Sequence, residues 1–302
     1  MTLVTGITGK TGKWFLDHLI KSHENIDGCK KFRFIIRKSS KIELKNNGDL
    51  EFEKFYGDLE DESFLTDAMK GVETVLHIAG IHLSEKVVKA ALNNEVKWMI
   101  LVHTTGIYSK YKSACSEYIK TENNISKMVD NSNVAMTILR PTMVYGSIKD
   151  QNLIIFIKMV DKLRFFPIVN NAKYPLQPLH EKDLGIAYFL VLQNEKITKN
   201  NNYDLSGKDP IFLIDMLKII GDNLEKKTHF ISIPFSIAYL CAYIVFLISF
   251  TKVDYREKVQ RLIEPRAYPH KKASDDFDFS PVSFEEGIKP EVKDYLENKK
   301  IN

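Results

Sequence analysis

Short apolar runs alternate with segments of helical periodicity along the first half of the chain. The runs that predict buried strands lie at residues 3–4, 32–36, 75–78, 99–102 and 135–139, and the first of them is followed by a helical pattern near 11–22. Strands that alternate with helices in this way are typical of a parallel sheet covered on both faces, with right-handed crossovers. The pattern therefore predicts an α/β fold built on a doubly wound parallel sheet.

The pattern changes after Arg140 and Pro141, where the segments become longer, aromatic residues become more frequent and strands are scattered. We therefore expect a core domain over 1–147 and a smaller, mostly helical C-terminal lobe over 148–302 that supplies the substrate side. The segment 174–193 is expected to return to the core domain. No stretch rich in Pro, Gly or Ser separates the two parts.

One segment of the second half is almost free of polar side chains. Residues 228–251 contain no Asp, Glu, Lys or Arg, and residues 235–250 read FSIAYLCAYIVFLISF. A helix over 235–251 would be about 26 Å long, slightly shorter than a ~30 Å hydrocarbon core. We favour burial in the C-terminal lobe or in a homodimer interface. An in-plane contact with a membrane surface is the main alternative, because Lys226, Lys227 and Lys252 flank the segment.

Composition excludes several other classes of protein. The net charge of +4 comes from 43 basic and 39 acidic residues that are spread along the chain, so we do not expect nucleic-acid binding. The three cysteines, Cys29, Cys115 and Cys241, are far apart and form no CxxC pair, which indicates reduced thiols and no metal site. The chain goes directly from Met1 into a strand and a glycine turn, which predicts a cytoplasmic protein, with membrane association as an alternative.

The first candidate site is the glycine-rich stretch LVTGITGKTGKWFLDHL, between the first strand and the first helix. Gly6, Gly9 and Gly12 allow a tight turn and a close approach to a pyrophosphate, which the N–H groups and the positive dipole end of the helix can bind. This is the phosphate loop of a Rossmann domain. The other candidate contacts within it are Thr8, Lys10 and Thr11.

The end of the second strand indicates which dinucleotide binds. A site that prefers NAD carries an acid there for the ribose 2′-hydroxyl, whereas an NADP site carries basic groups for the 2′-phosphate. Arg37 and Lys38 occupy this position, and no acid follows before Glu43. We therefore expect NADP(H), with NAD as the less favoured cofactor.

Several further motifs agree in order with one known family. They are TGITGKTG, YGDLED at 56–61, VLHIAG at 75–80, ILRPTMVYG at 138–146, LQPLHEKDLGIAYFLVL at 176–192 and DFDFSPVSFEEGI at 276–288. Together they resemble the short-chain dehydrogenase/reductase superfamily, in particular its extended and atypical epimerase/dehydratase-like and NmrA-like members. The framework also resembles the reductase-like accessory subunit of respiratory complex I. Nearly the whole chain is covered by the resemblance.

The resemblance implies further cofactor contacts and a class of substrate. Asp58 and Leu59 are implied at the adenine, and Ile78, Ala79 and Gly80 at the nicotinamide ribose. Thr104 and Pro141 are implied at the ends of the fifth and sixth strands. The implied substrate is a small molecule of the carbonyl, quinone or nucleotide-sugar class.

The residues that would handle a proton depart from the family pattern. Family enzymes use a Ser or Thr after the fifth strand and then a helix with Tyr-x-x-x-Lys, because a nearby ammonium lowers the pKa of the phenol. Thr105 matches the first position, and Tyr118 follows it by 13 residues. Glu122 stands where the lysine is expected, and a carboxylate on the same helix face would raise the phenol pKa. Lys120 lies about 200° round the helix from Tyr118 and is a poor replacement.

Tyr108 and Lys112 also match Tyr-x-x-x-Lys, but Tyr108 is only three residues beyond Thr105 and should still lie in the loop. We interpret this match as a coincidence. Two hypotheses follow for the whole chain. The first is an NADP(H)-dependent oxidoreductase or epimerase-like enzyme with an atypical active site. The second is a non-catalytic dinucleotide-binding protein that acts as a redox sensor or assembly partner.

Overall fold

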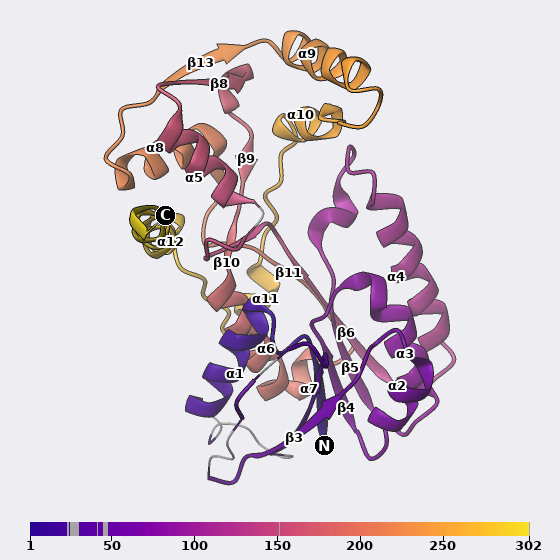
Figure 1. Cartoon of the computed structure of the whole chain (residues 1–302). Coiled ribbons are helices and arrows are strands. Elements are labelled where there is room, and N and C mark those ends of the chain that lie inside the picture. Colours follow the sequence, from indigo (N-terminus) through magenta and orange to yellow (C-terminus); the bar gives the residue numbers. More distant parts are fainter. Residues whose placement is uncertain (23, 25–29, 41, 45–47, 151, 302) are drawn as a thin grey trace.

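A computed structural model describes residues 1–22, 24, 30–40, 42–44, 48–150 and 152–301, which leaves Cys29 outside the described residues. Its centre is a seven-stranded parallel sheet with the strand order β11-β6-β5-β4-β1-β2-β3 (Figure 1). The strands are β1 (Thr2–Thr5), β2 (Lys31–Ile36), β3 (Glu51–Tyr56), β4 (Thr74–His77), β5 (Trp98–Val102), β6 (Ala135–Pro141) and β11 (Asn202–Leu205). The predicted doubly wound sheet is confirmed. The order 3-2-1-4-5-6 within it is that of dinucleotide-binding folds.

Two strands of this sheet were not predicted, and both lie at its edges. β3 carries Glu51, Glu53 and Lys54, so it has no apolar run. β11 is only four residues long, and its buried side chains are Tyr203 and Leu205. An edge strand needs few apolar residues because one side faces solvent, so the apolar pattern is weak there.

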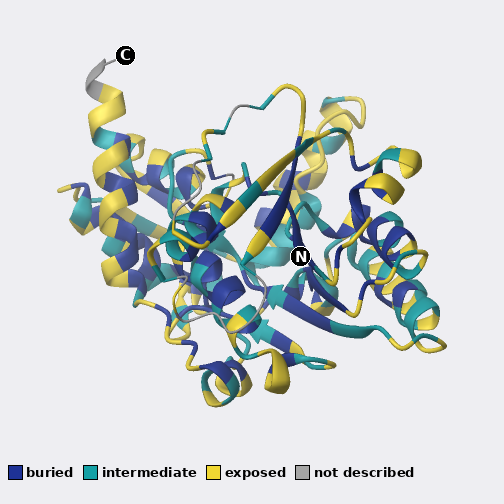
Figure 2. Ribbon diagram, turned by 90° about the horizontal axis from the view of Figure 1, so that it is seen from below, coloured by how far each residue is buried: buried dark blue, intermediate teal, exposed yellow. Residues whose placement is uncertain are grey.

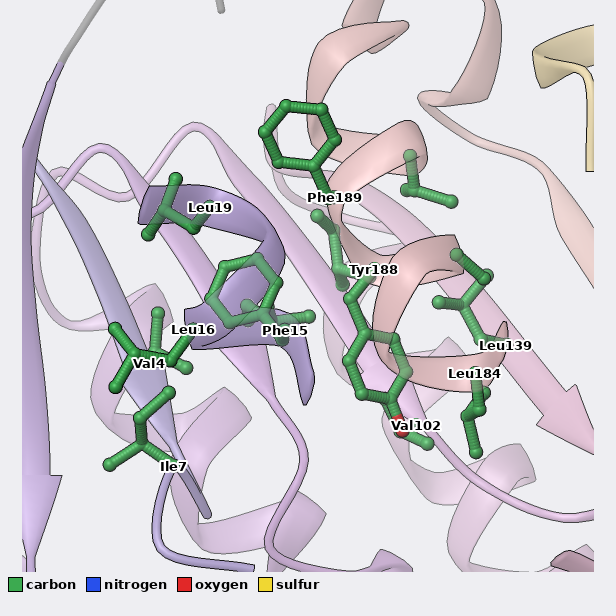
Figure 3. Packing of buried hydrophobic residues seen from close by; sticks show 14 of the residues in the cluster. Val4, Ile7, Phe15, Leu16, Leu19, Val102, Leu139, Leu184, Tyr188 and Phe189 are labelled. Carbon is green, nitrogen blue, oxygen red and sulfur yellow. The ribbon is translucent and has the colours of Figure 1, made fainter. Parts of the chain in front are cut away.

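Helices cover both faces of the sheet. Alternate residues of each inner strand point to opposite faces, so Leu3 and Val4 of β1 enter two different cores. One face is covered by α1 (Lys10–Ser22) and α6 (Glu181–Gln193), and Figure 3 shows Phe15 and Leu19 of α1 on one side of that core and Tyr188 and Phe189 of α6 on the other. The opposite face is covered by α2 (Glu62–Ala68), α3 (Ser84–Leu92) and α4 (Cys115–Val129). In Figure 2 the buried strands lie between helices whose outer faces are exposed.

The chain beyond residue 148 contributes to this core at three places. α6 packs so closely against α1 that a Cβ on Gly185 would lie 2.5 Å from Cβ of Trp14. β11 pairs with β6, and α11 (Lys271–Phe277) places Phe277 in the same core. These contacts hold the C-terminal lobe against the sheet.

The C-terminal lobe has its own core, formed by α5 (Leu153–Lys162), α8 (Leu213–Asn223) and α12 (Phe284–Ile301). Six further strands form three two-stranded pairs outside the main sheet: β10 with β7, β12 with β9, and β13 with β8. Their bounds are β7 (Val144–Tyr145), β8 (Phe165–Val169), β9 (Pro175–Leu176), β10 (Leu179–His180), β12 (Ile211–Phe212) and β13 (His229–Ile233). The remaining helices are α7 (Glu195–Thr198), α9 (Phe235–Ile248) and α10 (Arg256–Leu262), with short 3-10 turns η2 (Ile81–Leu83), η3 (Thr105–Tyr108) and η4 (Asn170–Ala172).

The apolar segment 235–250 forms a helix, but the favoured burial within the lobe is wrong. Only Ala238 and Ala242 of α9 are buried, and most of its large side chains are exposed. The sequence pattern could not reveal this, because apolar residues surround the helix on all sides and indicate no preferred face. Within the described part of the chain, no helix is both long enough and apolar enough to cross a membrane.

Candidate functional site

The phosphate loop connects β1 to α1 at the point where the strand order reverses. Gly6 has a φ of 76°, and its carbonyl accepts a hydrogen bond from the N–H of Gly9 at 2.9 Å. A Cβ on Gly12 would lie 2.4 Å from the carbonyl oxygen of Gly6, so no larger residue fits between the helix and the loop. Lys10 begins α1, and the first N–H groups of that helix have no partner within it. Backbone donors and a positive helix end therefore meet where a pyrophosphate would bind.

The end of β4 forms the next wall of this site. Thr5 Oγ1 lies 2.8 Å from Nδ1 of His77, and Nε2 of His77 lies 3.0 Å from the carbonyl oxygen of Gly80. Burial lowers the pKa of His77 to about 4, so the ring is neutral and holds the turn by hydrogen bonds. A Cβ on Gly6 would lie 2.9 Å from the backbone nitrogen of Ala79. Ile78 and Ala79 therefore lie directly beside the phosphate loop, and Gly80 follows them in the turn that His77 holds. His77 is a contributor that the sequence analysis missed.

The ends of β2 and β3 lie side by side on the other side of the loop. Ile36 pairs with Tyr56, and the N–H of Gly57 donates to the carbonyl of Ile36 at 3.1 Å. This pairing places Arg37 and Lys38 next to the turn that carries Asp58 and Leu59, and Arg37, Lys38 and Asp58 are exposed. Two cationic side chains are therefore exposed at the end of β2. In folds of this type, residues at this strand end distinguish a ribose 2′-phosphate from a 2′-hydroxyl.

The ends of β5 and β6 carry the candidate hydroxyl groups. Thr104 Oγ1 accepts a hydrogen bond from the N–H of Gly106 at 3.0 Å and caps the η3 turn. Thr105 is buried, and its hydroxyl donates to the carbonyl of Pro141 at 3.2 Å. The two strand ends are thereby fixed to each other at the edge where ligands bind in this type of sheet.

Glu122 is buried in α4 and binds two residues from neighbouring strands. Its carboxylate accepts hydrogen bonds from Nε and Nη2 of Arg140 at 2.9 and 2.5 Å, and Nδ1 of His103 lies 3.0 Å away. Burial alone would raise the pKa of Glu122, but the hydrogen bonds of His103 and Arg140 outweigh it and bring the pKa to about 2. Nε2 of His103 reaches Ser84 Oγ at 3.1 Å. Glu122 therefore clamps β5 and β6 to α3 and α4, which the spacing from Tyr118 did not predict.

The lysine that lies near the ring of Tyr118 is Lys112, and not Lys120 of the same helix as Tyr118. Lys120 is exposed, whereas the ammonium of Lys112 lies 4.7 Å from the ring centroid of Tyr118. Lys112 precedes α4 and reaches back to Gly106, where an added Cβ would meet its Nζ at 3.0 Å. The sequence analysis dismissed Lys112 together with its apparent partner Tyr108.

Tyr108 itself lies in the η3 turn before α4, as its distance from the strand end predicts. Its hydroxyl donates to Oδ1 of Asp204 at 3.0 Å, and burial with the nearby Asp204 carboxylate raises its pKa to about 12. Its ring lies 5.2 Å from that of Tyr268. The phenol of Tyr108 is therefore held by a carboxylate and is a poor proton donor at neutral pH.

A cavity of about 350 Å³ opens beside these strand ends, which is within the usual range for small-molecule sites. It is lined by His103, Thr104, Thr105, Gly106, Ser109, Lys112, Pro141, Thr142, Met143, Val144, Asn152, Leu176, Gln177, Arg261, Arg266 and Tyr268. The N-terminal sheet and the C-terminal lobe thus both contribute to its wall. Candidate residues Thr104, Thr105 and Pro141 belong to it, whereas Tyr118, Lys120 and Glu122 do not line it.

The most distinctive feature of this cavity is its positive charge. Among the described residues the buried Nε atoms of Arg261 and Arg266 have no hydrogen-bond partner, and Nε of Arg261 forms only a long ion pair, at 4.0 Å, with Oε2 of Glu264. Burial lowers the pKa of Arg266 to about 10, so its guanidinium stays charged at neutral pH. Glu264 is the adjacent acid, but its oxygens accept hydrogen bonds from the hydroxyl of Ser109 at 2.8 Å and the N–H of Lys110 at 2.6 Å. Unpaired buried donors of this kind favour an anionic ligand.

Comparison of the sequence with protein families gives one match. The profile of an NAD(P)H-binding family matches residues 6–156, which is half of the 302-residue chain. The chain belongs to this NAD(P)H-binding family. Comparison with curated proteins found no match.

Solved structures similar to this member of the NAD(P)H-binding family are enzymes of related fold. A dTDP-glucose 4,6-dehydratase from Streptomyces venezuelae with NAD bound is 15% identical, with 99% of this chain and 98% of that chain covered and a TM-score of 0.71. UDP-glucose 4-epimerase from Thermotoga maritima is 18% identical, with 99% of each chain covered and a TM-score of 0.68. An NADPH-dependent quinone oxidoreductase from Escherichia coli is 16% identical, with 98% and 100% covered and a TM-score of 0.69. At these identities the similarities show the fold alone, and it is the fold of NAD- and NADPH-binding enzymes.

The residues present fit the dinucleotide of the NAD(P)H-binding family. Gly6 and Gly12 let the loop, the helix and the end of β4 pack backbone against backbone, and the free N–H groups of the helix N-terminus would bind the pyrophosphate. Sequence reasoning did not find Arg261 and Arg266, because these two residues of the C-terminal lobe meet Lys112 only in the folded chain. The pair of arginines in RLIEPR at 261–266 is the sequence signal that could have indicated them.

Proposed function

We propose that the protein is an NADP(H)-dependent oxidoreductase or epimerase-like enzyme whose substrate carries an anionic group, as in a nucleotide-sugar. The observation that carries this proposal is the charge of the cavity beside the strand ends. Three cationic side chains contribute to its lining, namely Lys112, Arg261 and Arg266. A neutral quinone or simple carbonyl compound would leave the buried Nε of Arg266 without a hydrogen-bond partner, whereas a phosphate or carboxylate would bind it.

The cofactor part of the proposal rests on the phosphate loop and on the end of β2. The glycine turn and the N-terminus of α1 would hold the pyrophosphate, and Arg37 and Lys38 would bind the 2′-phosphate of NADP. When bound, this cofactor supplies a hydride or accepts one. Arg37 and Lys38 are both exposed, so a phosphate can reach their side chains.

The proton-handling part of the proposal assigns the lysine to Lys112, which lines the cavity, and the phenol to Tyr118, which contacts Lys112 but does not itself line the cavity. A phenol with a pKa near 10 needs a nearby cation before it can exchange a proton at neutral pH. Lys112 is the cation 4.7 Å from the Tyr118 ring, and it also lines the cavity. Thr105 would orient the reacting group of the substrate. Lys120 is exposed and takes no part in the proposed reaction. Glu122 is bound by Arg140 and His103, and we propose that it is a positioning residue.

A second candidate function is a non-catalytic NADPH-binding sensor or assembly protein. The observation that favours it is Glu122, which uses the usual position of the lysine for a structural clamp. Both candidates require the same phosphate loop. They differ in whether the bound cofactor takes part in a reaction, either with net oxidation or reduction in an oxidoreductase or transiently in an epimerase.

The deciding experiment combines cofactor titration with an acceptor screen. We expect NADPH to bind more tightly than NADH, and NADPH oxidation or NADP reduction to occur with nucleotide-sugars or other phosphorylated compounds and not with neutral quinones. Arg266→Gln should lower kcat/KM for the anionic substrate at least about tenfold, since a hydrogen bond between charged groups contributes about 1.5–3 kcal/mol. Lys196→Gln, a change at an exposed lysine of α7, is the matched control.

The NADPH titration of Arg266→Gln shows whether this variant is folded. NADPH binding without turnover of any acceptor, and without conversion of any nucleotide-sugar to its epimer, would favour the sensor. Turnover of neutral quinones that is unaffected by Arg266→Gln would contradict the anionic substrate.

A further inference from the structure

The apolar helix α9 lies at the far end of the C-terminal lobe, away from the N-terminal sheet (Figure 1). Its inner side carries small residues, Ala238 and Ala242, which are its buried positions. It packs against α10, where the guanidinium of Arg256 lies 3.9 Å from the ring centroid of Phe246. The helix is therefore fixed to the lobe along one side only.

The outer side of α9 is a continuous aliphatic face. Ile237, Leu240, Ile244 and Leu247 follow one another at spacings of three and four residues, and they are 51, 56, 43 and 53% exposed. Residues at these spacings share one face of a helix. Phe250 lies two residues beyond the end of α9 and is 84% exposed. A contiguous apolar surface of this kind marks an interaction site.

The charge around α9 indicates what covers this face. No acidic residue lies between Lys226 and Asp254, and the carboxylate of Asp254 is paired with Arg256 at 2.7 Å. Lys227 and Lys252 are exposed on either side of the apolar stretch. Lys226, by contrast, forms an ion pair with Asp161, with 3.8 Å between Nζ and Oδ1. An apolar face bracketed by free lysines matches the interior and the anionic headgroups of a lipid surface. A protein partner of mixed charge would not require this one-sided pattern.

The length of the helix decides its orientation. α9 has 14 residues, which corresponds to about 21 Å and is too short for a ~30 Å hydrocarbon core. It also remains attached to α10 along its inner side. We propose that α9 lies in the plane of an anionic membrane surface and inserts its outer face, with Phe250, between the headgroups.

This docking surface is connected to the cavity by a short segment. α10 follows α9 directly and carries Arg261, and the next residues carry Arg266 and Tyr268, all of which line the cavity. Membrane docking at α9 therefore holds one cavity wall close to the lipid surface. The inference stands on the exposure and charge of α9 and does not depend on the proposed reaction.

Vesicle flotation of the full chain tests the proposal. We expect the wild-type protein to float with vesicles of phosphatidylcholine and about one third phosphatidylglycerol, to bind pure phosphatidylcholine vesicles more weakly, and to lose binding as salt is added. Leu240→Gln/Leu247→Gln should weaken binding at least about tenfold, since it removes two apolar side chains from the face. The matched control is Ile155→Gln/Ile197→Gln, which changes two isoleucines that are 48 and 50% exposed on other helices.

The electrostatic part has its own variant. Lys227→Gln/Lys252→Gln should lower binding to the anionic vesicles by about fivefold for each lysine and leave binding to pure phosphatidylcholine unchanged. The proposal is overturned if the wild-type protein floats with neither vesicle, or if Leu240→Gln/Leu247→Gln binds as tightly as the wild type and the Ile155→Gln/Ile197→Gln control do. It is also overturned if sedimentation shows a dimer that dissociates in Leu240→Gln/Leu247→Gln and the wild type does not bind vesicles. In that case the face is an interface between copies of this chain.

Discussion

Arg140 donates two hydrogen bonds to Glu122, through Nε at 2.9 Å and Nη2 at 2.5 Å. This bidentate pair joins the end of β6 to α4 at the position where the resemblance leads one to expect the active-site lysine. Both side chains are nearly buried, with 12 and 10% exposure. Position 122 therefore has a structural role in this protein, because Glu122 joins α4 to β6 through Arg140.

Glu122→Lys is expected to destabilise the protein instead of restoring a standard active site. The new ammonium would face Arg140 in a buried site, and breaking a buried pair costs about 3–5 kcal/mol. The midpoint of chemical denaturation should fall accordingly. Glu117→Lys, at an exposed position in the first turn of the same helix, is the control and should have a much smaller effect. Equal midpoints for the two variants would contradict the clamp.

Charge reversal at the end of β2 should change cofactor preference. Arg37→Glu/Lys38→Glu removes both candidate partners of the 2′-phosphate and adds repulsion, so NADPH affinity should fall at least about tenfold while NADH affinity changes little. Fluorescence titration with both cofactors measures this. Lys70→Glu, at an exposed lysine after α2, is the control for net charge. A parallel loss of both affinities would show that the two residues do not discriminate the 2′-phosphate.

The assignment of the lysine can be tested directly. If Tyr118 and Lys112 act together, Tyr118→Phe and Lys112→Met should each lower kcat at least about tenfold and leave NADPH affinity unchanged. Lys127→Met, at an exposed lysine of the same helix, is the control. If Lys120→Met lowers kcat and Lys112→Met does not, the lysine is Lys120 and the proposed pairing is wrong.

The sequence predicted the parts of the molecule that depend on local pattern. The inner strands could be predicted because burial on both faces requires a run of apolar residues. The glycine loop could be predicted because a tight turn requires glycines at a fixed spacing. β3 and β11 have no clear apolar run in the sequence, since an edge strand needs little apolar surface. The cavity charge could not be predicted, because Lys112 and Arg266 are 154 residues apart in the sequence. The exposure of α9 was missed for a related reason, since an all-round apolar helix does not show which side is covered.

Glu291 of α12 gives the final prediction, because its carboxyl group is buried beside that of Asp150. The Oε2 atom of Glu291 accepts a hydrogen bond from the N–H of Gly146 at 2.9 Å. Burial, together with the hydrogen bond and charge of Asp150, raises the pKa of Glu291 to about 9. We therefore expect the folded state to keep a proton on Glu291 at neutral pH. Oε1 of Glu291 and Oδ2 of Asp150 are buried and have no hydrogen-bond partner among the described residues, so this proton would bridge the two carboxyl groups. Oδ1 of Asp150 also caps α5 by accepting a hydrogen bond from the N–H of Leu153 at 2.8 Å.

The sign of the resulting pH dependence follows from the raised pKa. Between the unfolded pKa of about 4.5 and the folded value of about 9, the folded chain binds the proton and the unfolded chain does not, so the free energy of unfolding falls as pH rises, by at most about 1.4 kcal/mol per pH unit. Glu291→Gln carries a permanent N–H in place of the proton and should lack this decline. Denaturation of both proteins from pH 5 to pH 9 measures the difference, with Glu285→Gln, at an exposed position of the same helix, as the control. If Glu291→Gln and the wild type lose stability in parallel over this range, Glu291 is ionised in the folded protein and the shared proton does not exist.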